Sequence, residues 1–430
     1  MCLTVPAQIV KLERSQALVR DGDAVKTINV SLITNLKIGD WILYISDLAI
    51  KKISKNDAQE ILTLLKSPRK INIQKLDTRF RNIIKAVRVR DLTKKEIVYL
   101  LNTEGSEKKA LLSEANIARK TYLKDFICVH GIIEFSNFCG NDCLYCGLRK
   151  GNQKLKRYRM SVDEIVKTAQ EAVNKKGYKL LVLQSGEDSF YTGEMLCEII
   201  EKIKAKCRVF IFMSIGERGY DVYKKMKKAG ASGALFRFET SNSRLFRELH
   251  PRGKNFKNRF EHLKFMKELG YFIATGSVIG FPEQTIEDLA DDILTTKKWA
   301  NAISMGPFIQ AQDTPLAGVF REEKSNKWKT EMNFKMIAIS RLLMPTVRIP
   351  ATTALETIAG EKGRRKALWA GANSLMLNLT PAKYRPLYKI YDNKFYQKEN
   401  IWEKYGLFKN EESYKMLEER MQKELKRKSQ

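Results

Sequence analysis

Between residues 129 and 379 the chain alternates short apolar runs with amphipathic helical patterns, and this alternation limits the possible folds more than any other feature. Capping-box sequences mark two of the helix starts, at Ser161-Val-Asp-Glu164 and Thr285-Ile-Glu-Asp288. Eight strands that alternate with helices predict an α/β protein built on a parallel (β/α)8 barrel. The predicted strands are Val129–Ser136, Lys179–Ser185, Arg208–Ile215, Gly233–Glu239, Tyr271–Ile279, Ala302–Ile309, Val347–Ala354 and Ser374–Leu379.

The first 66 residues have a different pattern and predict a separate small β-barrel domain with one helix. Short β-rich runs separated by turns are followed by a helix over Asn56–Leu65, with Asn56 as its N-cap. The predicted strands are Ala7–Leu12, Ala17–Arg20, Thr27–Leu32 and Trp41–Ile45. We expect residues 67–80 to be a linker, residues 81–395 to form the barrel domain and residues 396–430 to be a charged helical tail. Two further helices are predicted before the barrel, at Thr93–Leu101 and Glu107–Tyr122.

Composition and cysteine usage indicate a cytoplasmic globular protein. Of the 430 residues 43% are hydrophobic, but no apolar run approaches the ~20 residues of a membrane span. The start, Met-Cys-Leu-Thr-Val-Pro, does not resemble a signal peptide. Seven cysteines, an odd number, argue against a secreted disulfide framework. We expect Cys197 and Cys207 to be inert small hydrophobic residues.

The formal charge of +29 allows more than one interpretation. A basic surface is typical of nucleic-acid binding, but the lysines are spread along the chain without an aromatic-interleaved basic arm. A lysine-rich composition, together with docking of an acidic electron donor such as ferredoxin or flavodoxin, accounts for the charge better. We therefore expect no nucleic acid and no membrane among the partners.

Three cysteines, Cys139, Cys143 and Cys146, form a Cys-x3-Cys-x2-Cys triplet directly after the first barrel strand. Three thiolates can bind three irons of a [4Fe–4S] cluster, which leaves the fourth iron open to a small molecule. The alternative is a structural zinc site, which needs four ligands. The only further candidate ligands nearby in the sequence are Cys128 and His130. The cluster is the better interpretation.

The triplet, with Tyr145 before its third cysteine, closely resembles the motif of the radical S-adenosylmethionine (SAM) enzymes. The resemblance implies a TIM-type radical SAM barrel in which the open iron binds SAM. It also implies that an electron from the cluster cleaves SAM to a 5′-deoxyadenosyl radical.

Polar motifs follow the barrel strands, where parallel barrels place their active sites. Arg237 suits the SAM carboxylate, and Glu217 and Glu239 suit its sulfonium, ammonium or ribose. The turn from Gly276 to Gly280 allows backbone amides to approach the adenine. The predicted SAM-binding residues are Tyr145, Ser185, Gly186, Glu187, Glu217, Arg237, Glu239, Gly276 and Gly280.

From Val129 to about Lys394 the chain is similar to HydE, the family of radical SAM maturases of [FeFe]-hydrogenase. The matching strings include Gly131-Ile-Ile-Glu-Phe-Ser-Asn, Cys143-Leu-Tyr-Cys-Gly-Leu-Arg, Lys156-Arg-Tyr-Arg-Met, Leu183-Gln-Ser-Gly-Glu-Asp, Asp313-Thr-Pro-Leu, Ile349-Pro-Ala-Thr-Thr-Ala and Thr380-Pro-x-x-Tyr-Arg385. The resemblance implies processing of an iron–cyanide–carbonyl–cysteine precursor of the H-cluster, alongside other hydrogenase maturases. It places Thr352, Thr353, Met376 and Tyr384 near that substrate. A positively lined cavity would suit such an anionic precursor.

The sequence departs from HydE in two ways. No cysteine follows Cys207, so the second cluster of some family members is absent. The N-terminal domain instead resembles HypC, a chaperone family of [NiFe]-hydrogenase maturation, through Met1-Cys-Leu-Thr-Val-Pro, Gly39-Asp-Trp-Ile-Leu-Tyr and Asp57-Ala-Gln-Glu; Ala7 replaces the usual Gly. In that family Cys2 helps to hold an iron–cyanide–carbonyl unit, which implies a fused iron-ligand carrier; alternatively, Cys2 is an ordinary terminal residue.

Three alternatives to this function stay open. One is a radical SAM enzyme like biotin synthase or methylornithine synthase, although a sulfur-inserting enzyme would need additional cluster cysteines. Another is a non-catalytic maturation scaffold, against which the complete cysteine triplet argues. The last is an RNA-modifying protein, for which charge is the only evidence.

Overall fold

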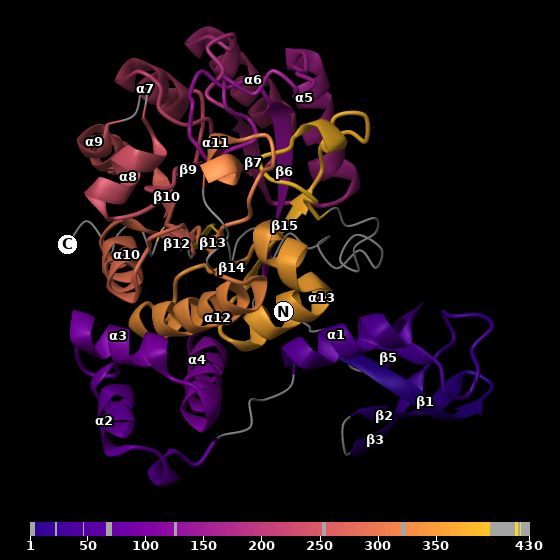
Figure 1. Ribbon diagram of the computed structural model, residues 1–430. Helices are drawn as coiled ribbons and strands as arrows, with labels where there is room; N and C mark the ends of the chain where they lie inside the picture. The colour runs from indigo at the N-terminus through magenta and orange to yellow at the C-terminus, as the bar shows by residue number, and fades with distance from the viewer. Residues whose placement is uncertain are drawn as a thin grey trace. The chain divides into compact units, whose positions relative to one another are not determined.

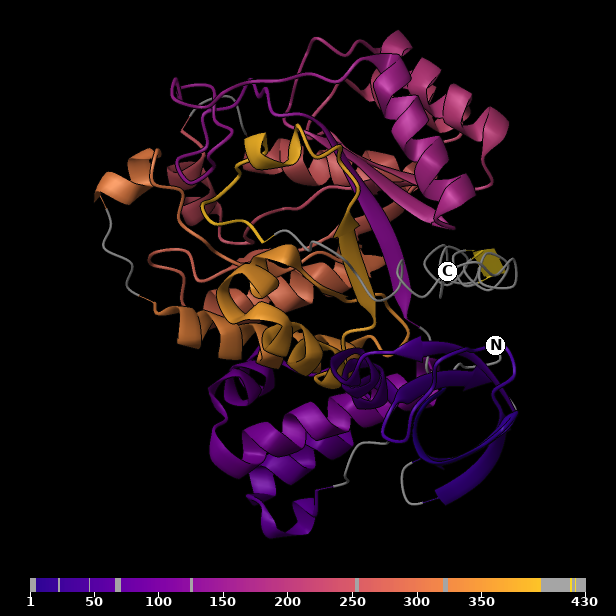
Figure 2. The same cartoon turned by 90° about the vertical axis from the view of Figure 1, so that its right-hand side faces the viewer.

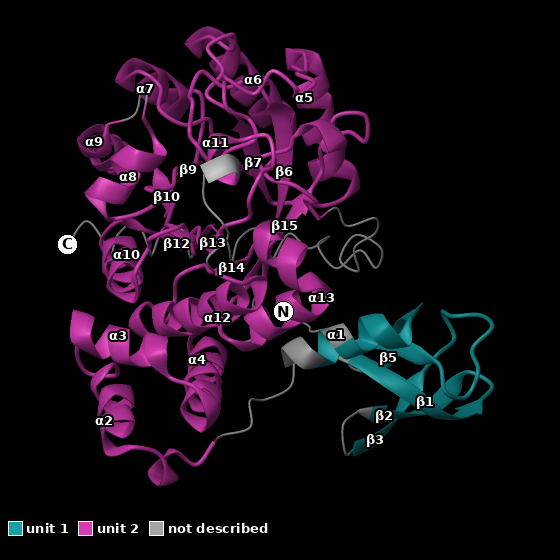
Figure 3. Cartoon of the chain, viewed as in Figure 1, with its two compact units in different colours: residues 1–68, 399–407 teal, residues 69–398, 408–430 magenta. Residues whose placement is uncertain are grey.

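The computed structural model describes residues 5–21, 24–45, 47–65, 71–123, 127–251, 255–319 and 324–395, and residues 418, 419 and 422. The chain divides into two compact units, residues 1–68 with 399–407 and residues 69–398 with 408–430 (Figure 3). The predicted tail, 396–430, falls almost wholly outside the described residues, as does Cys2.

The first unit contains a closed five-stranded barrel and one helix. Its strands are β1 (Val5–Glu13), β2 (Gln16–Asp21), β3 (Ala24–Asn29), β4 (Trp41–Ile45) and β5 (Leu48–Ile53), in the order β1-β2-β3-β5-β4. Alternate residues point inward, so Ala7, Ile9, Ala17 and Val19 are buried in the small core. Helix α1 (Lys55–Leu65) contributes Ala58 and Ile61 to a second cluster with Leu43 and Ile53 of the barrel.

Three details of this unit differ from the prediction. Strand β5 was not predicted, because Lys51 and Lys52 interrupt its apolar pattern. Strand β3 begins and ends three residues before the predicted run. The N-cap of α1 is Ser54 and not Asn56, since the Ser54 Oγ accepts a hydrogen bond from the Asp57 N–H at 3.1 Å.

The second unit begins with three helices that precede its barrel. They are α2 (Thr78–Ala86), α3 (Lys94–Asn102) and α4 (Gly105–Leu123), and a 3-10 turn at Ile73–Lys75 lies within the predicted linker. A capping box of Thr93 and Glu96 starts α3. Helix α4 packs on α12 (Asn326–Leu343), and Figures 1 and 2 show the three helices grouped below it.

Eight parallel strands form the predicted barrel. They are β6 (Cys128–Ser136), β7 (Leu180–Ser185), β8 (Phe210–Ser214), β9 (Gly233–Leu235), β10 (Phe272–Thr275), β12 (Ala302–Ile303), β14 (Pro350–Ala351) and β15 (Ser374–Asn378). They pair in the order β12-β10-β9-β8-β7-β6-β15-β14. A bridge between Ala302 and Arg348, with the Ile303 N–H donating to the Arg348 carbonyl at 2.7 Å, brings the two edges together. The sheet is therefore nearly closed, as a (β/α)8 barrel requires.

The remaining helices are α5 (Val162–Gln170, continued by a π-helical turn, Glu171–Lys175), α6 (Gly193–Lys206), α7 (Tyr220–Lys228), α8 (Ser243–Leu249), α9 (Phe256–Glu268), α10 (Ile286–Trp299), α11 (Pro315–Val319) and α13 (Thr353–Trp369). Most of them pack around the outside of the sheet (Figure 2). Both predicted capping boxes, at Ser161/Glu164 and Thr285/Asp288, are present. None of the described helices is long and apolar enough to cross a membrane.

Several strands end earlier than predicted. Strands β9, β12 and β14 have only two or three residues, because the chain leaves the sheet and presents polar side chains above the strand ends. A small two-stranded sheet, β11 (Val278–Ile279) with β13 (Gly306–Pro307), extends the wall at this end. The barrel therefore carries its irregular backbone at its C-terminal rim, where the predicted motifs lie.

Candidate functional site

A cavity of about 310 Å³ opens among the loops that follow the barrel strands. It brings together predicted residues that lie up to 237 positions apart in the sequence, between Cys139 and Met376. The predicted residues that line it are Cys139, Cys143, Tyr145, Cys146, Ser185, Gly186, Glu187, Arg237, Glu239, Thr352, Thr353 and Met376.

Four other predicted residues do not line the cavity. Glu217 pairs with Arg259 at 3.2 Å just behind the wall. Tyr384 stacks on Tyr158, with ring centroids 4.7 Å apart, and donates a hydrogen bond to Glu164 at 3.0 Å, so it faces α5.

The remaining two are glycines, Gly276 and Gly280, which shape the wall from behind. A Cβ at Gly276 would lie 2.7 Å from the Ser304 carbonyl oxygen, and Gly280 has a φ of +91°. The side chain of Gln284 accepts the Gly280 N–H at 2.7 Å. This turn is thus closely packed against its own neighbours.

The loop that carries the three cysteines is fastened to three separate segments by backbone hydrogen bonds. The Gly140 N–H donates to the Glu187 carbonyl at 2.9 Å, and the Gly147 N–H donates to the Ile390 carbonyl at 3.0 Å. Between them the Leu144 N–H donates to Leu249 at 3.0 Å. The loop is therefore held at its start, middle and end, which fixes where the thiols stand.

Gly186, directly after β7, lies so close to the cysteine loop that no side chain fits there. A Cβ at this position would lie 2.1 Å from the Phe138 carbonyl oxygen and 2.8 Å from the Cys139 Cβ. The Gly186 N–H donates to the Ser136 carbonyl at 3.1 Å, which holds the two segments together. Close approach, and not a positive φ, explains this glycine.

The chemistry of the thiols suits a bound cationic cluster. Burial raises the pKa of Cys146 to about 12, and the neighbouring Cys139 adds to the effect. Thiolates are the form that binds metal, so the site needs the positive charge of iron to ionise at neutral pH. Among the described residues no three His, Cys, Asp or Glu side chains converge on one metal ion. The ligands of an iron–sulfur cube bind different irons, so they need not converge in that way.

Tyr145 is anchored by a buried histidine. The His250 Nδ1 lies 2.7 Å from the Phe246 carbonyl oxygen, which can only accept, so Nδ1 carries a proton. In the neutral ring Nε2 then accepts from the Tyr145 hydroxyl at 3.1 Å. The Tyr145 ring also meets Phe281 edge-on at 4.9 Å. The residue before the third cysteine is thus fixed against the cavity wall.

Arg237 and Glu239 follow β9 and form an ion pair at 3.1 Å in the cavity wall. Burial is the largest influence on Arg237 and opposes its charge, but Glu239, together with Tyr145, Tyr391 and Cys146, outweighs burial and raises the pKa of the guanidinium. Glu239 has a φ of +68°, a conformation that is uncommon for a residue with a side chain and concentrates at functional sites. The Val278 N–H donates to its carbonyl at 2.8 Å, which helps to hold this backbone.

A buried aspartate supports the same loop from behind. Asp292 of α10 accepts hydrogen bonds from the Ser241 N–H and hydroxyl, both at 2.6 Å, and from the Gln284 amide at 3.1 Å. Burial raises the pKa of Asp292 to about 7, against the hydrogen bonds from Ser241. Through Gln284 this network joins the loop after β9 to the turn at Gly280.

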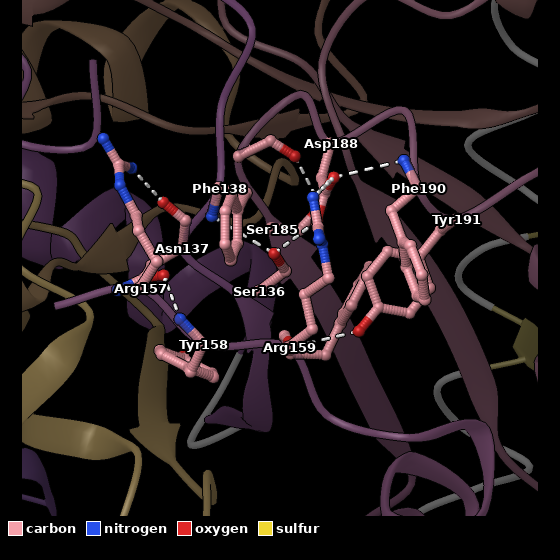
Figure 4. A network of polar contacts seen from close by, with 12 residues as sticks. Ser136, Asn137, Phe138, Arg157, Tyr158, Arg159, Ser185, Asp188, Phe190 and Tyr191 are labelled. Atoms are coloured by element: carbon pink, nitrogen blue, oxygen red, sulfur yellow. Dashed lines mark hydrogen bonds and ion pairs between the residues drawn. The ribbon is translucent and has the colours of Figure 1, made fainter. Parts of the chain in front are cut away.

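Figure 4 shows a second polar network, at the start of the cysteine loop. Arg159 donates to both carboxylate oxygens of Asp188, at 2.8 and 2.9 Å, and the Ser136 hydroxyl donates to the same group at 2.6 Å. Burial opposes ionisation of Asp188, but these hydrogen bonds keep its pKa below the usual value. The guanidinium also stacks on Phe138 at 3.7 Å and Phe190 at 4.5 Å, and so packs the residue before Cys139.

The cavity has charged residues that the sequence did not single out. Glu134 of β6 and Lys394 form a buried ion pair, and the Asn378 amide donates to Glu134 at 2.8 Å. Arg259 is a further cation, and Tyr388 and Tyr391 add two hydroxyls to the lining. The one hint of Glu134 in the sequence was that it interrupts the otherwise apolar run Gly131-Ile-Ile-Glu-Phe.

These residues change the expected electrostatics. Among the described residues, the charged side chains that line the cavity are three cations, Arg237, Arg259 and Lys394, and three carboxylates, Glu134, Glu187 and Glu239. These charges balance, so the described lining is not the positive one that would suit an anionic precursor. Pairing explains the balance, since Arg237 and Lys394 each face a carboxylate.

Comparisons with known proteins agree with this geometry. The model of the Radical SAM superfamily matches residues 133–295, and the model of the HupF/HypC family matches residues 1–65. The [FeFe] hydrogenase maturase subunit HydE of Thermotoga maritima is 42% identical over 316 residues, 73% of this chain and 88% of that protein. The 3-methylornithine synthase of Methanosarcina acetivorans is 30% identical over 310 residues, 71% of this chain and 84% of that protein.

A solved structure supports the same fold. The crystal structure of methylornithine synthase (PylB) superposes with a TM-score of 0.62 at 26% identity, over 70% of this chain and 85% of that one. Barrel, cysteine loop and family model together define a radical SAM enzyme. Within that superfamily the chain belongs to the HydE family, and it carries a HupF/HypC domain at its N-terminus.

Proposed function

We propose that this chain is a radical SAM enzyme of hydrogenase maturation. The observation that carries the proposal is the position of the cysteine triplet, which lines one cavity together with Arg237, Glu239 and the end of β7. The similarity to HydE over most of the barrel supports the maturation role. That relative is a maturase subunit of [FeFe] hydrogenase, and we propose the same role for this chain.

In this proposal Cys139, Cys143 and Cys146 hold a [4Fe–4S] cluster, and SAM binds beside them. The cluster and SAM, when bound, supply a 5′-deoxyadenosyl radical. Arg237 pairs with the SAM carboxylate. The rest of the SAM molecule is positioned by Glu239, Glu187, Ser185 and Tyr145. Thr352, Thr353 and Met376 line the substrate side, with Thr352 as the N-cap of α13.

The other predicted site residues receive indirect roles. Gly186 allows the strand end to approach the cysteine loop, and Gly276 and Gly280 allow the wall to pack closely. Glu217 orients Arg259, and its own N–H donates to the Glu187 carboxylate at 2.9 Å. Tyr384 supports the segment that carries Tyr388.

The proposed substrate is an iron–cyanide–carbonyl–cysteine precursor, and the proposed electron donor is ferredoxin or flavodoxin. Because the cavity lining is balanced in charge, the anionic character of the precursor adds no support of its own. The proposal for the substrate therefore depends on the similarity to HydE. Other hydrogenase maturases are the expected partners.

The decisive test is anaerobic. We expect the reconstituted full chain, with reductant and SAM, to form 5′-deoxyadenosine, measured by chromatography. Cys143→Ala should abolish the product, whereas Cys197→Ala, which changes a cysteine on α6 away from the cavity, should leave it unchanged. A wild-type chain that holds its cluster but forms no 5′-deoxyadenosine would contradict the catalytic proposal and favour a scaffold.

For the N-terminal domain we propose an iron-ligand carrier, with Cys2 as the ligand. Once Met1 is removed, Cys2 carries both a thiolate and a free α-amine, which together can chelate a metal, and fusion to the barrel raises the effective concentration of the carried unit. We expect iron–cyanide infrared bands on the full chain after maturation, and their loss in Cys2→Ala. Bands of equal intensity in the variant would refute the carrier role.

A second candidate function follows from the similarity to 3-methylornithine synthase. The lower identity, 30% against 42%, places it behind the maturase. Finding 3-methylornithine among the products of the 5′-deoxyadenosine assay would reverse that order.

A further inference from the structure

The sequence Lys156-Arg-Tyr-Arg-Met160 follows the cysteine loop, and nothing in the proposed function so far uses Arg157. Its guanidinium lies at the place where the two ends of the cysteine loop come together. Nη1 donates to the Asn137 carbonyl at 2.6 Å and to the Leu148 carbonyl at 2.9 Å. Figure 4 shows Arg157 against the Asn137 end.

The second terminal nitrogen of the Arg157 guanidinium, Nη2, adds two hydrogen bonds to this clamp on the ends of the cysteine loop. Nη2 donates to the Arg149 carbonyl at 2.7 Å and to the Asn152 carbonyl at 3.3 Å. Asn137 stands two residues before Cys139, and Leu148 stands two residues after Cys146. One rigid, planar group therefore fixes the distance between the entry and the exit of the loop.

Asn137 completes the clamp from the other side. Its amide donates to the carbonyls of Lys156 and Leu387 at 2.9 and 2.8 Å, and its side-chain oxygen accepts the Tyr158 N–H at 2.7 Å. The segment around Arg157 is thus held by the loop that Arg157 itself holds. Neither partner can move without breaking several hydrogen bonds.

The charge of Arg157 has no carboxylate partner among the described residues, because its guanidinium donates to backbone carbonyls alone. Burial lowers the pKa of this guanidinium, and the thiols Cys139 and Cys146 act in the opposite direction. Arginine nevertheless stays charged in proteins. A fixed positive charge therefore lies within electrostatic reach of two of the three cysteines.

We propose that Arg157 is a positioning residue that closes the cysteine loop around its cluster, and that its unpaired charge raises the reduction potential of that cluster. The inference rests on the proposed [4Fe–4S] site. A nearby cation stabilises the reduced form, which carries one more negative charge, so it makes the cluster easier to reduce.

Two substitutions separate geometry from charge. Arg157→Lys keeps a positive charge but loses the planar fork that reaches four carbonyls. Arg157→Gln removes the charge and most of the hydrogen bonds. The matched control is Arg218→Gln: Arg218 donates to the carbonyls of Asp188 and Tyr191, both at 2.6 Å, but not to the cysteine loop.

The experiment uses the full chain, reconstituted anaerobically, with two readouts that do not depend on activity. One is the rate of cluster loss to a chelator, followed by the visible absorbance. The other is the midpoint potential, from a redox titration followed by electron paramagnetic resonance. We expect both Arg157 variants to lose the cluster on the order of tenfold faster than wild type. Only Arg157→Gln should show a more negative potential, and Arg218→Gln should match wild type in both.

The outcomes are distinguishable. A chelator rate at the wild-type level in both Arg157 variants overturns the positioning role. An unchanged potential in Arg157→Gln, or an equal shift in Arg218→Gln, overturns the role of the charge. If Arg157→Gln does not fold, Arg157→Lys still tests the positioning role, and a wild-type chelator rate there overturns it. A wild-type chain that binds no cluster is instead a failure of the proposed function.

Discussion

The variant Gly186→Ala is expected to lose most of its iron and to form 5′-deoxyadenosine at least ~100-fold more slowly than wild type, because misplacement by about 1 Å has effects of that size. The added Cβ would lie 2.1 Å from the Phe138 carbonyl oxygen and 2.8 Å from the Cys139 Cβ. These two atoms belong to the backbone or are bonded to it, so the clash cannot be relieved by rotation of a flexible side chain. The loop must move, and Cys139 moves with it.

Gly193→Ala is the matched control for this variant. Gly193 is the first residue of α6, and the nearest atom to an added Cβ there is 3.6 Å away, which is ordinary contact. Alanine also favours the helix over glycine. Iron content, measured after reconstitution, and 5′-deoxyadenosine should both equal wild type. A Gly186→Ala chain with full iron content and full rate would show that the loop can relax, and that close packing at Gly186 is not what positions Cys139.

The barrel could be predicted because its strands are buried on both faces and read as apolar runs between helices. All eight were found, and both predicted capping boxes exist. Strand ends were less predictable, since Phe236 and Phe238 continue an alternating, strand-like pattern beyond the end of β9. Strand β5 and helix α2 were missed because lysines and arginines interrupt their apolar patterns.

The candidate site was predictable where one short segment carries the proposed ligands, as in Cys139 to Cys146. It was less predictable where a role depends on contacts between distant segments. Arg157 acts through carbonyl oxygens, which no sequence pattern displays. Lys394 lies 260 residues from Glu134, and only the fold brings the two together. Tyr384 and Glu217 belong to the right motifs, but their side chains point behind the cavity wall.

The second large effect concerns that buried pair. Lys394→Met should lower the free energy of unfolding by roughly 3–5 kcal/mol, because removal of one partner leaves a buried charge uncompensated. Glu134 is 2% exposed and would keep only the Asn378 amide as a hydrogen-bond donor to its carboxylate in the described residues. The measurement is chemical unfolding of the full chain. Lys383→Met is the control, since Lys383 pairs with Glu164 at the exposed surface, where solvent screens the charges and such pairs contribute little to stability.

A second variant tests whether the uncompensated charge causes the loss, because Lys394→Met leaves the buried Glu134 carboxylate without its ion-pair partner. The double variant Glu134→Gln/Lys394→Met removes the charge as well and should recover more than half of the loss. If the single variant is as stable as Lys383→Met at neutral pH, water in the cavity solvates Glu134, and the pair is not needed to hold the wall.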